Sequence, residues 1–92
     1  MDLVKLHNQT RELLEALADR LPADRLAGYR SLSAAGEWAE LVDLVGASLV
    51  KRQIPVTPAE RDQLAEVLAQ FPPNPEYRYL SDPDLLTKLT IA

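Results

Sequence analysis

Apolar residues recur at three- and four-residue spacing along most of the chain, which predicts amphipathic helices. The first stripe comprises Leu3, Leu6, Thr10, Leu13, Leu14, Leu17 and Leu21. At 100° per residue these positions span roughly 100° of a helix surface, the width of a core-facing stripe. Asp2 is the predicted N-cap. This helix should end near Arg20, because Pro22 disfavours helical backbone in the residue before it.

Two further helices follow. Pro22 suits the first turn of the second helix, and Gly36 is its predicted left-handed C-cap residue. Its inward residues are expected to be Leu26, Tyr29 and Leu32. The third helix is predicted from about Glu37 to Lys51, although Gly46 in its interior costs about 1 kcal/mol relative to alanine. Its buried stripe comprises Trp38, Leu41, Val42, Val45 and Leu49.

A fourth helix has the clearest start signal in the chain. In the sequence TPAE at residues 57–60, Thr57 is the predicted N-cap, Pro58 the first helical residue and Glu60 the partner that completes a capping box. The connector at 53–56 is predicted to be extended and to bury its isoleucine and valine at the end of the core. The inward residues of the fourth helix are Leu64, Val67, Leu68 and Phe71.

Composition changes at residue 72, which divides the four-helix part at 1–71 from a Pro- and Tyr-rich tail at 72–92. Residues 72–80 are predicted to be extended. A short fifth helix should follow, with Asp82 as N-cap and Pro83 at its first position, and we expect the tail to pack on the same domain. The predicted fold is therefore all-α: a small antiparallel bundle of four main helices with an extended Pro-rich C-terminal segment.

Charge and composition exclude several classes of protein. The 92 residues carry a formal net charge of −4, and their ten scattered Lys and Arg residues do not form the cluster that a nucleic-acid backbone requires. A helix-turn-helix would fit the second and third helices, but its reading helix would present acids to phosphates. The sequence has no cysteine, no signal-peptide pattern and no apolar run long enough for a membrane span. We expect a cytoplasmic protein that binds neither nucleic acid nor membrane.

No catalytic pattern is visible. The single histidine, His7, lies at the edge of an apolar stripe with no nucleophile or ligand set around it. The three glycines are too far apart for a phosphate loop. Glu12, Glu15 and Asp19 form a solvated helix face without an EF-hand loop. We therefore expect no enzymatic activity, no metal and no cofactor.

Two surfaces remain as candidates for binding a protein partner. The first is the acidic face of the third helix, Glu37, Glu40 and Asp43, which spreads over about 120° beside the buried stripe. It is either an ordinary solvated face or a docking patch for a cleft rich in Lys and Arg. The second comprises Tyr77, Arg78 and Tyr79. These residue types are enriched at binding hot spots, but the two tyrosines would equally serve to fasten the tail to its own bundle.

The central block of the chain has a distinctive order of landmarks. They are Leu21-Pro22, Gly36-Glu37-Trp38, Leu49 and Ile54-Pro55-Val56-Thr57-Pro58-Ala59-Glu60. Over roughly residues 10 to 70, this order and spacing resembles the MafI-like immunity proteins, small helical proteins encoded beside polymorphic toxins of bacterial competition. After the aromatic residue the family tends to have a small residue, an aliphatic one and then alanine, whereas this chain has Ala39, Glu40 and Leu41. The tail from Pro72 also exceeds the family pattern.

The resemblance implies a cytoplasmic antidote that binds the C-terminal toxic domain of a cognate effector, encoded by a neighbouring gene, and masks its active cleft. Such toxins are often nucleases with basic clefts. The resemblance does not identify the binding residues, because partner surfaces diversify with the toxin. The alternative hypothesis is a non-enzymatic helical adaptor or dimerisation domain of another regulatory complex, and self-association as a homodimer remains open in either case.

Overall fold

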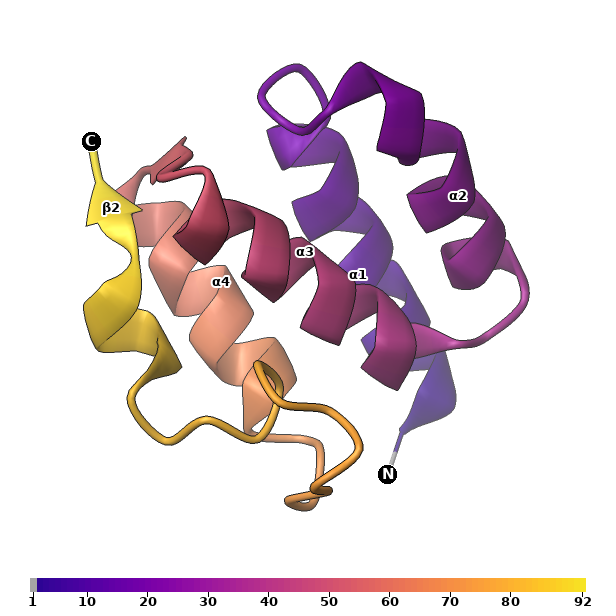
Figure 1. Cartoon of the computed structure of the whole chain (residues 1–92). Coiled ribbons are helices and arrows are strands. Elements are labelled where there is room, and N and C mark those ends of the chain that lie inside the picture. The colour runs from indigo at the N-terminus through magenta and orange to yellow at the C-terminus, as the bar shows by residue number, and fades with distance from the viewer. Residues whose placement is uncertain (1) are drawn as a thin grey trace.

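Four α-helices make up most of the chain (Figure 1). The computed structural model describes residues 2–92. The helices are α1 (Leu3–Leu17), α2 (Ala23–Ala34), α3 (Trp38–Lys51) and α4 (Pro58–Leu68). Helix α1 contacts the other three, and α2 also packs against α3. The prediction of an all-α fold is confirmed at this level, whereas the antiparallel arrangement of the bundle remains a prediction.

A short parallel sheet joins the connector after α3 to the end of the chain. Strand β1 (Pro55–Val56) pairs with β2 (Thr90–Ile91), with Pro55 opposite Thr90 and Val56 opposite Ile91. The backbone N–H of Ala92 extends the pairing by donating to the carbonyl of Val56 at 2.8 Å. The sequence did not predict this sheet, because two-residue strands are too short to show an alternating pattern.

The tail differs from the prediction in two respects. Turns lie at residues 75–76 and 78–80 of the segment predicted to be extended, where the N–H of Tyr77 donates to the carbonyl of Asn74 and the N–H of Ser81 donates to that of Tyr77. The predicted short helix is the 3₁₀ helix η1 (Leu85–Lys88), which begins at Leu85 with Asp84 before it, instead of at Pro83 with Asp82 as N-cap. Asp82 forms a local turn by accepting the N–H of Asp84 at 2.8 Å, which displaces the helical start.

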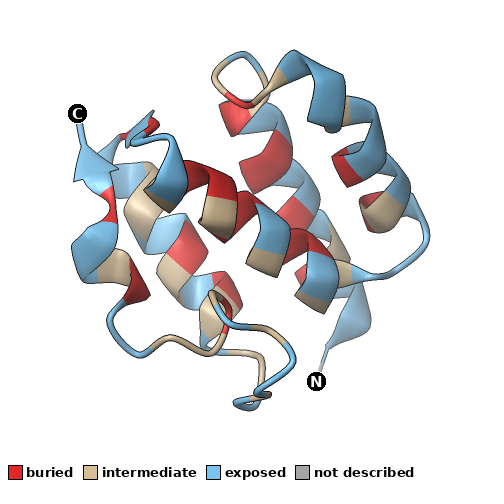
Figure 2. Cartoon of the chain, in the orientation of Figure 1, coloured by how far each residue is buried: buried red, intermediate tan, exposed pale blue. Residues whose placement is uncertain are grey.

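The core draws on every part of the chain (Figure 2). Its fully buried side chains are Leu6, Leu17, Leu41, Leu49, Leu64, Leu85, Val56 and Val67. Leu80, Leu85 and Leu89 of the tail belong to this core, as do Ile54 and Val56 of the connector. Some residues predicted to face inward lie half-buried at its edge: Leu26, Leu32, Trp38, Leu68 and Phe71.

The start of α1 is as predicted, but its end and the start of α2 are shifted. Asp2 accepts the N–H of Lys5 at 3.0 Å, which confirms it as the N-cap. Helix α1 ends at Leu17 rather than near Arg20, and a turn follows. Pro22 precedes α2 at the N-cap position instead of lying in its first turn.

Gly36 ends α2 through the backbone geometry predicted for it. Its φ is 76°, and the N–H of Glu37 reaches back to the carbonyl of Leu32 at 3.0 Å. A left-handed residue, followed by a residue whose N–H donates to the carbonyl five positions earlier, is a Schellman motif. The indole N–H of Trp38 donates to the carbonyl of Ser33 at 3.1 Å, so the turn fixes the direction in which α3 leaves.

The predicted capping box of α4 also carries a long-range ion pair. Thr57 accepts the N–H of Glu60 at 3.1 Å, and Glu60 accepts the N–H of Thr57 at 2.8 Å. The guanidinium of Arg20 bonds both carboxylate oxygens of Glu60, and also donates to the carbonyls of Ala16 and Pro55. This cluster joins the end of α1, strand β1 and the start of α4.

These contacts shift the pKa of Glu60. The hydrogen bonds from Arg20 lower it most, the N–H of Thr57 lowers it further, and partial burial opposes both, so that the pKa of Glu60 falls to about 2. A carboxyl group whose pKa is lower in the folded chain than in the unfolded chain stabilises the fold. For Glu60 this stabilisation is fully present at pH values above its unfolded-state pKa of 4.5. That contribution is lost as the pH falls toward 2.

We predict that Glu60→Gln destabilises the protein by about 1–3 kcal/mol at pH 7, because it removes a charge-assisted bidentate pair. The free energy of unfolding, measured by urea titration between pH 7 and pH 2.5, should fall more steeply below pH 4.5 in the unmodified protein than in the variant. Parallel pH profiles for the two proteins would contradict the role assigned to Glu60.

We predict that replacing each of two glycines by alanine changes the stability of the protein in opposite directions. A methyl group at Gly28, inside α2, would meet nothing within 4 Å, so Gly28→Ala should stabilise by about 0.5–1 kcal/mol. Gly36→Ala should destabilise by about 1–2 kcal/mol because alanine is strained at a φ of 76°. Thermal melts of the two variants test this, and the same sign for both would refute the C-cap assignment.

Candidate interaction surface

Asp43 of α3 holds the tail against the helix. Its Oδ1 atom accepts the backbone N–H groups of Tyr79 at 2.7 Å and of Leu80 at 3.0 Å. The carboxylate is half-buried between the two segments, and hydrogen bonds to a charged acceptor are stronger than neutral ones. No sequence pattern predicts this contact, because the partners are backbone groups from a distant part of the chain.

Gly46 allows the tail to approach the backbone of α3. A Cβ atom placed on it would lie 3.5 Å from the Cβ of Tyr79 and 3.6 Å from Cδ2 of Leu85. These are ordinary van der Waals distances, so alanine would fit, whereas a longer side chain would displace the tail. The close approach to Gly46 comes from Tyr79 of the tail and Leu85 of η1.

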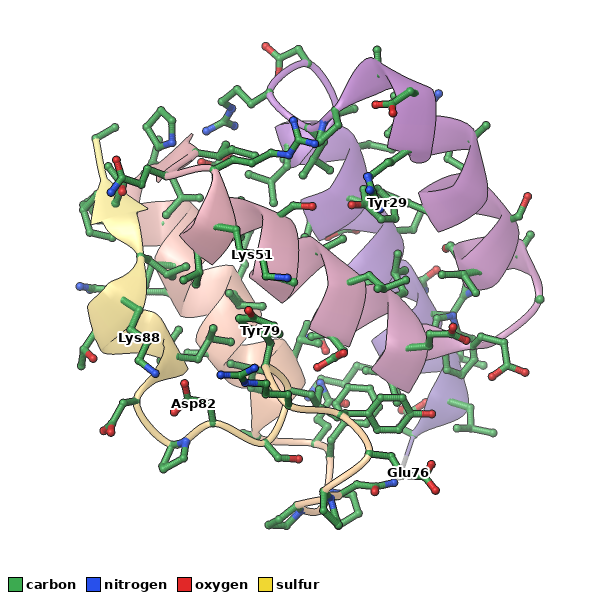
Figure 3. The ribbon with its side chains drawn as sticks, viewed as in Figure 1. Tyr29, Lys51, Glu76, Tyr79, Asp82 and Lys88 are labelled. Carbon is green, nitrogen blue, oxygen red and sulfur yellow. The ribbon has the colours of Figure 1, made fainter. Side chains whose placement is uncertain are left out.

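The ring of Tyr79 lies among cations (Figure 3). The Nζ atom of Lys51 is 5.6 Å from the ring centroid, and the Cζ atom of Arg78 is 6.0 Å from it. Both distances fall within the range of a cation–π contact. The tail and the C-terminal half of α3 therefore share a positively charged region.

The three predicted acids have different environments. Glu37 and Glu40 are exposed at the N-terminal end of α3, whereas Asp43 is occupied by the tail. The contact between Asp43 and Tyr79 brings the two predicted sites together, since one member belongs to each. We call the combined region the α3–tail surface; it comprises Glu37, Glu40, Asp43, Tyr77, Arg78 and Tyr79. Whether these residues bind a partner stays a prediction.

A groove of about 190 Å³ between α2 and α3 is positively charged, unlike the acidic start of α3. It is lined by Arg25, Tyr29, Leu44, Ala47, Ser48, Lys51 and Arg52. At its floor the hydroxyl groups of Tyr29 and Ser48 are hydrogen bonded at 2.7 Å. The sequence did not predict this basic groove. Arg25 and Lys51 lie on different helices, and their positions in the sequence do not indicate that the fold brings them together. Helix α3 is thus acidic near its start and basic near its end.

Residues 2–92 contain no group of three or more His, Cys, Asp or Glu side chains placed to hold a metal ion. Within that range, no helix is long and apolar enough to cross a membrane. His7 packs against the edge of Trp38, with ring centroids 5.5 Å apart, so its ring contributes to the contact between α1 and α3.

No family model, curated protein or solved structure matches this chain. The resemblance of residues 10–70 to the MafI-like immunity proteins therefore stays a prediction that depends on the quoted motifs. The function has to be inferred from the surface chemistry of the chain itself.

We predict that Asp43→Ala releases the tail. Removing two charge-assisted hydrogen bonds should cost about 2–3 kcal/mol and should speed hydrogen exchange at the amides of Tyr79 and Leu80. The matched control is Glu40→Ala, an exposed acid on the same helix, which should change stability by less than about 0.5 kcal/mol. Unchanged protection of the two tail amides in Asp43→Ala would show that the carboxylate does not hold the tail.

Proposed function

We propose that this protein is an immunity protein that binds the toxic domain of a cognate bacterial effector and masks its active cleft without catalysis. The observation that carries the proposal is that Glu37 and Glu40 are exposed on the helix whose Asp43 holds the tail segment that offers Tyr77 and Arg78. This combination of free carboxylates with aromatic and guanidinium groups suits a basic cleft. The resemblance to the MafI-like family supports the same assignment.

Charge complementarity supports the acidic end of α3 as the part that enters the cleft. Glu37 and Glu40 form no ion pair within residues 2–92. Their charge is therefore available to Lys and Arg side chains of a partner. Complementary charges speed the encounter of two proteins and fix their orientation, and the net charge of −4 favours approach to a basic toxin domain.

The tail would supply the anchoring contacts. Tyr77 is half-buried and Arg78 is exposed, and both residue types are frequent among the residues that contribute most to binding energy. Because Asp43 bonds the neighbouring Tyr79, which approaches α3 at Gly46, the segment is already ordered before a partner arrives. An ordered binding segment loses less conformational entropy on association than a flexible one.

This mode of action requires no catalytic group in the inhibitor. A toxin that cleaves nucleic acid must admit a polyanion to its active cleft, and an acidic helical face competes for the same Lys and Arg side chains. We propose that inhibition takes place in the cytoplasm and follows from occupancy of the cleft alone.

The test uses the toxin domain encoded by the neighbouring gene. We predict that the double variant Glu37→Lys/Glu40→Lys binds it with an association rate lower by roughly tenfold or more at low salt, with the difference shrinking as salt screens the charges. The control is Glu12→Lys/Asp62→Lys, which changes the net charge equally at exposed positions of α1 and α4. Surface plasmon resonance at several salt concentrations measures both variants.

Two outcomes would contradict the proposal. Absence of binding, together with absence of protection of cells that express the toxin, would exclude the immunity function and favour the adaptor hypothesis. Equal slowing by the test and control variants would mean that net charge, rather than the α3–tail surface, governs the association.

A further inference from the structure

One exposed stripe of α3 is complementary to itself. Its residues are Glu40, Leu44, Ala47 and Lys51, which fall within about 60° of the helix circumference at 100° per residue. The stripe is symmetric about a point between Val45 and Gly46, one residue past the midpoint of the helix. Glu40 and Lys51 are equally far from this point, and so are Leu44 and Ala47. An antiparallel copy of the same helix would therefore place Glu40 opposite Lys51, and Leu44 opposite Ala47.

The centre of the stripe is apolar and open. Leu44 is 37% exposed and is one of the few large hydrophobic side chains on the described surface. Ala47 is half-buried beside it, so a leucine of a facing helix would find space above this small residue, as side-chain ridges do in helix grooves. Helix α3 runs across the front of the molecule in Figure 1.

The basic groove lies at one end of this stripe. Among residues 2–92, none of Arg25, Lys51 and Arg52 forms an ion pair with a carboxylate. These three cations lie around one groove in a chain of net charge −4. The groove therefore suits an anionic group. Carboxylates that meet this requirement stand at the other end of the same helix, at Glu37 and Glu40.

We propose that a second copy of this chain docks on α3 in antiparallel orientation about a two-fold axis. The acidic start of α3 in each copy enters the basic groove between α2 and α3 of the other, and Leu44 packs over Ala47 at the centre. A two-fold arrangement makes each favourable contact twice. A basic partner would satisfy the acidic end alone and an acidic peptide the groove alone, whereas a second copy satisfies both ends and the apolar centre.

This dimer is independent of the proposed function, although both complexes use Glu40 and would exclude each other. A contact built around one helix from each chain is at the small end of specific interfaces. We therefore expect a weak dimer, with the monomer available when a tighter partner is present.

Charge exchange between two variants tests the arrangement. Glu40→Lys places two lysines in each stripe and Lys51→Glu places two glutamates, so each variant alone should dimerise roughly tenfold or more weakly than the unmodified chain. An equimolar mixture of the two should associate again, because every facing pair is then a lysine opposite a glutamate. Analytical ultracentrifugation at protein concentrations from about 10 µM to about 1 mM, where weak association is detectable, measures all four samples.

Asp62→Lys on α4 is the control for charge and should dimerise as the unmodified chain does, and circular dichroism checks that each variant is folded. A monomeric unmodified chain throughout the range would overturn the dimer. So would self-association of either variant at the unmodified strength, or a mixture no tighter than its components. The samples contain no toxin, so absence of the dimer would leave the proposed function standing, and absence of toxin binding would leave the dimer standing.

Discussion

The carboxylate of Asp43 is the contact on which the C-terminal part of this structure depends. By accepting the N–H groups of Tyr79 and Leu80, it fixes the tail on α3 at the point from which Leu80, Leu85 and Leu89 enter the core. A chain of 92 residues buries a limited share of its surface, so these leucines are a substantial part of its hydrophobic stabilisation. At the other end of the molecule, Glu60 and Arg20 join α1 to α4 in a comparable way.

The same helix that receives the tail also carries the charge pattern of the surface. Its start is acidic, its end borders a basic groove, and an exposed leucine lies between them. The acidic start with the adjacent tail suits the basic cleft of a toxin, whereas the whole stripe suits a second copy of the chain. In the proposed account these are alternative occupants of one helix, and the tighter of the two determines which complex forms.

Local signals in the sequence were sufficient for the four helices, for the starts of α1 and α4 and for the end of α2, but not for the end of α1 or the start of α2. The capping box at Thr57 and the left-handed turn at Gly36 involve residues a few positions apart, so the sequence displays both partners together. The contacts between Asp43 and Tyr79, and between Arg20 and Glu60, join residues far apart in the chain, and no pattern in the sequence pairs them. For that reason the sequence indicated the acidic face and the tyrosines as separate candidate sites. It could not predict that Asp43 of the first contacts Tyr79 of the second.

The central claim is that a cognate toxin domain binds the α3–tail surface. The most direct measurement is a residue-by-residue footprint of the complex, obtained from backbone amide chemical shifts of the labelled protein on addition of the unlabelled toxin domain. The account predicts that the largest changes lie around Glu37, Glu40, Tyr77 and Arg78. Changes confined to the outer face of α1 and α4, with these four residues unaffected, would contradict it.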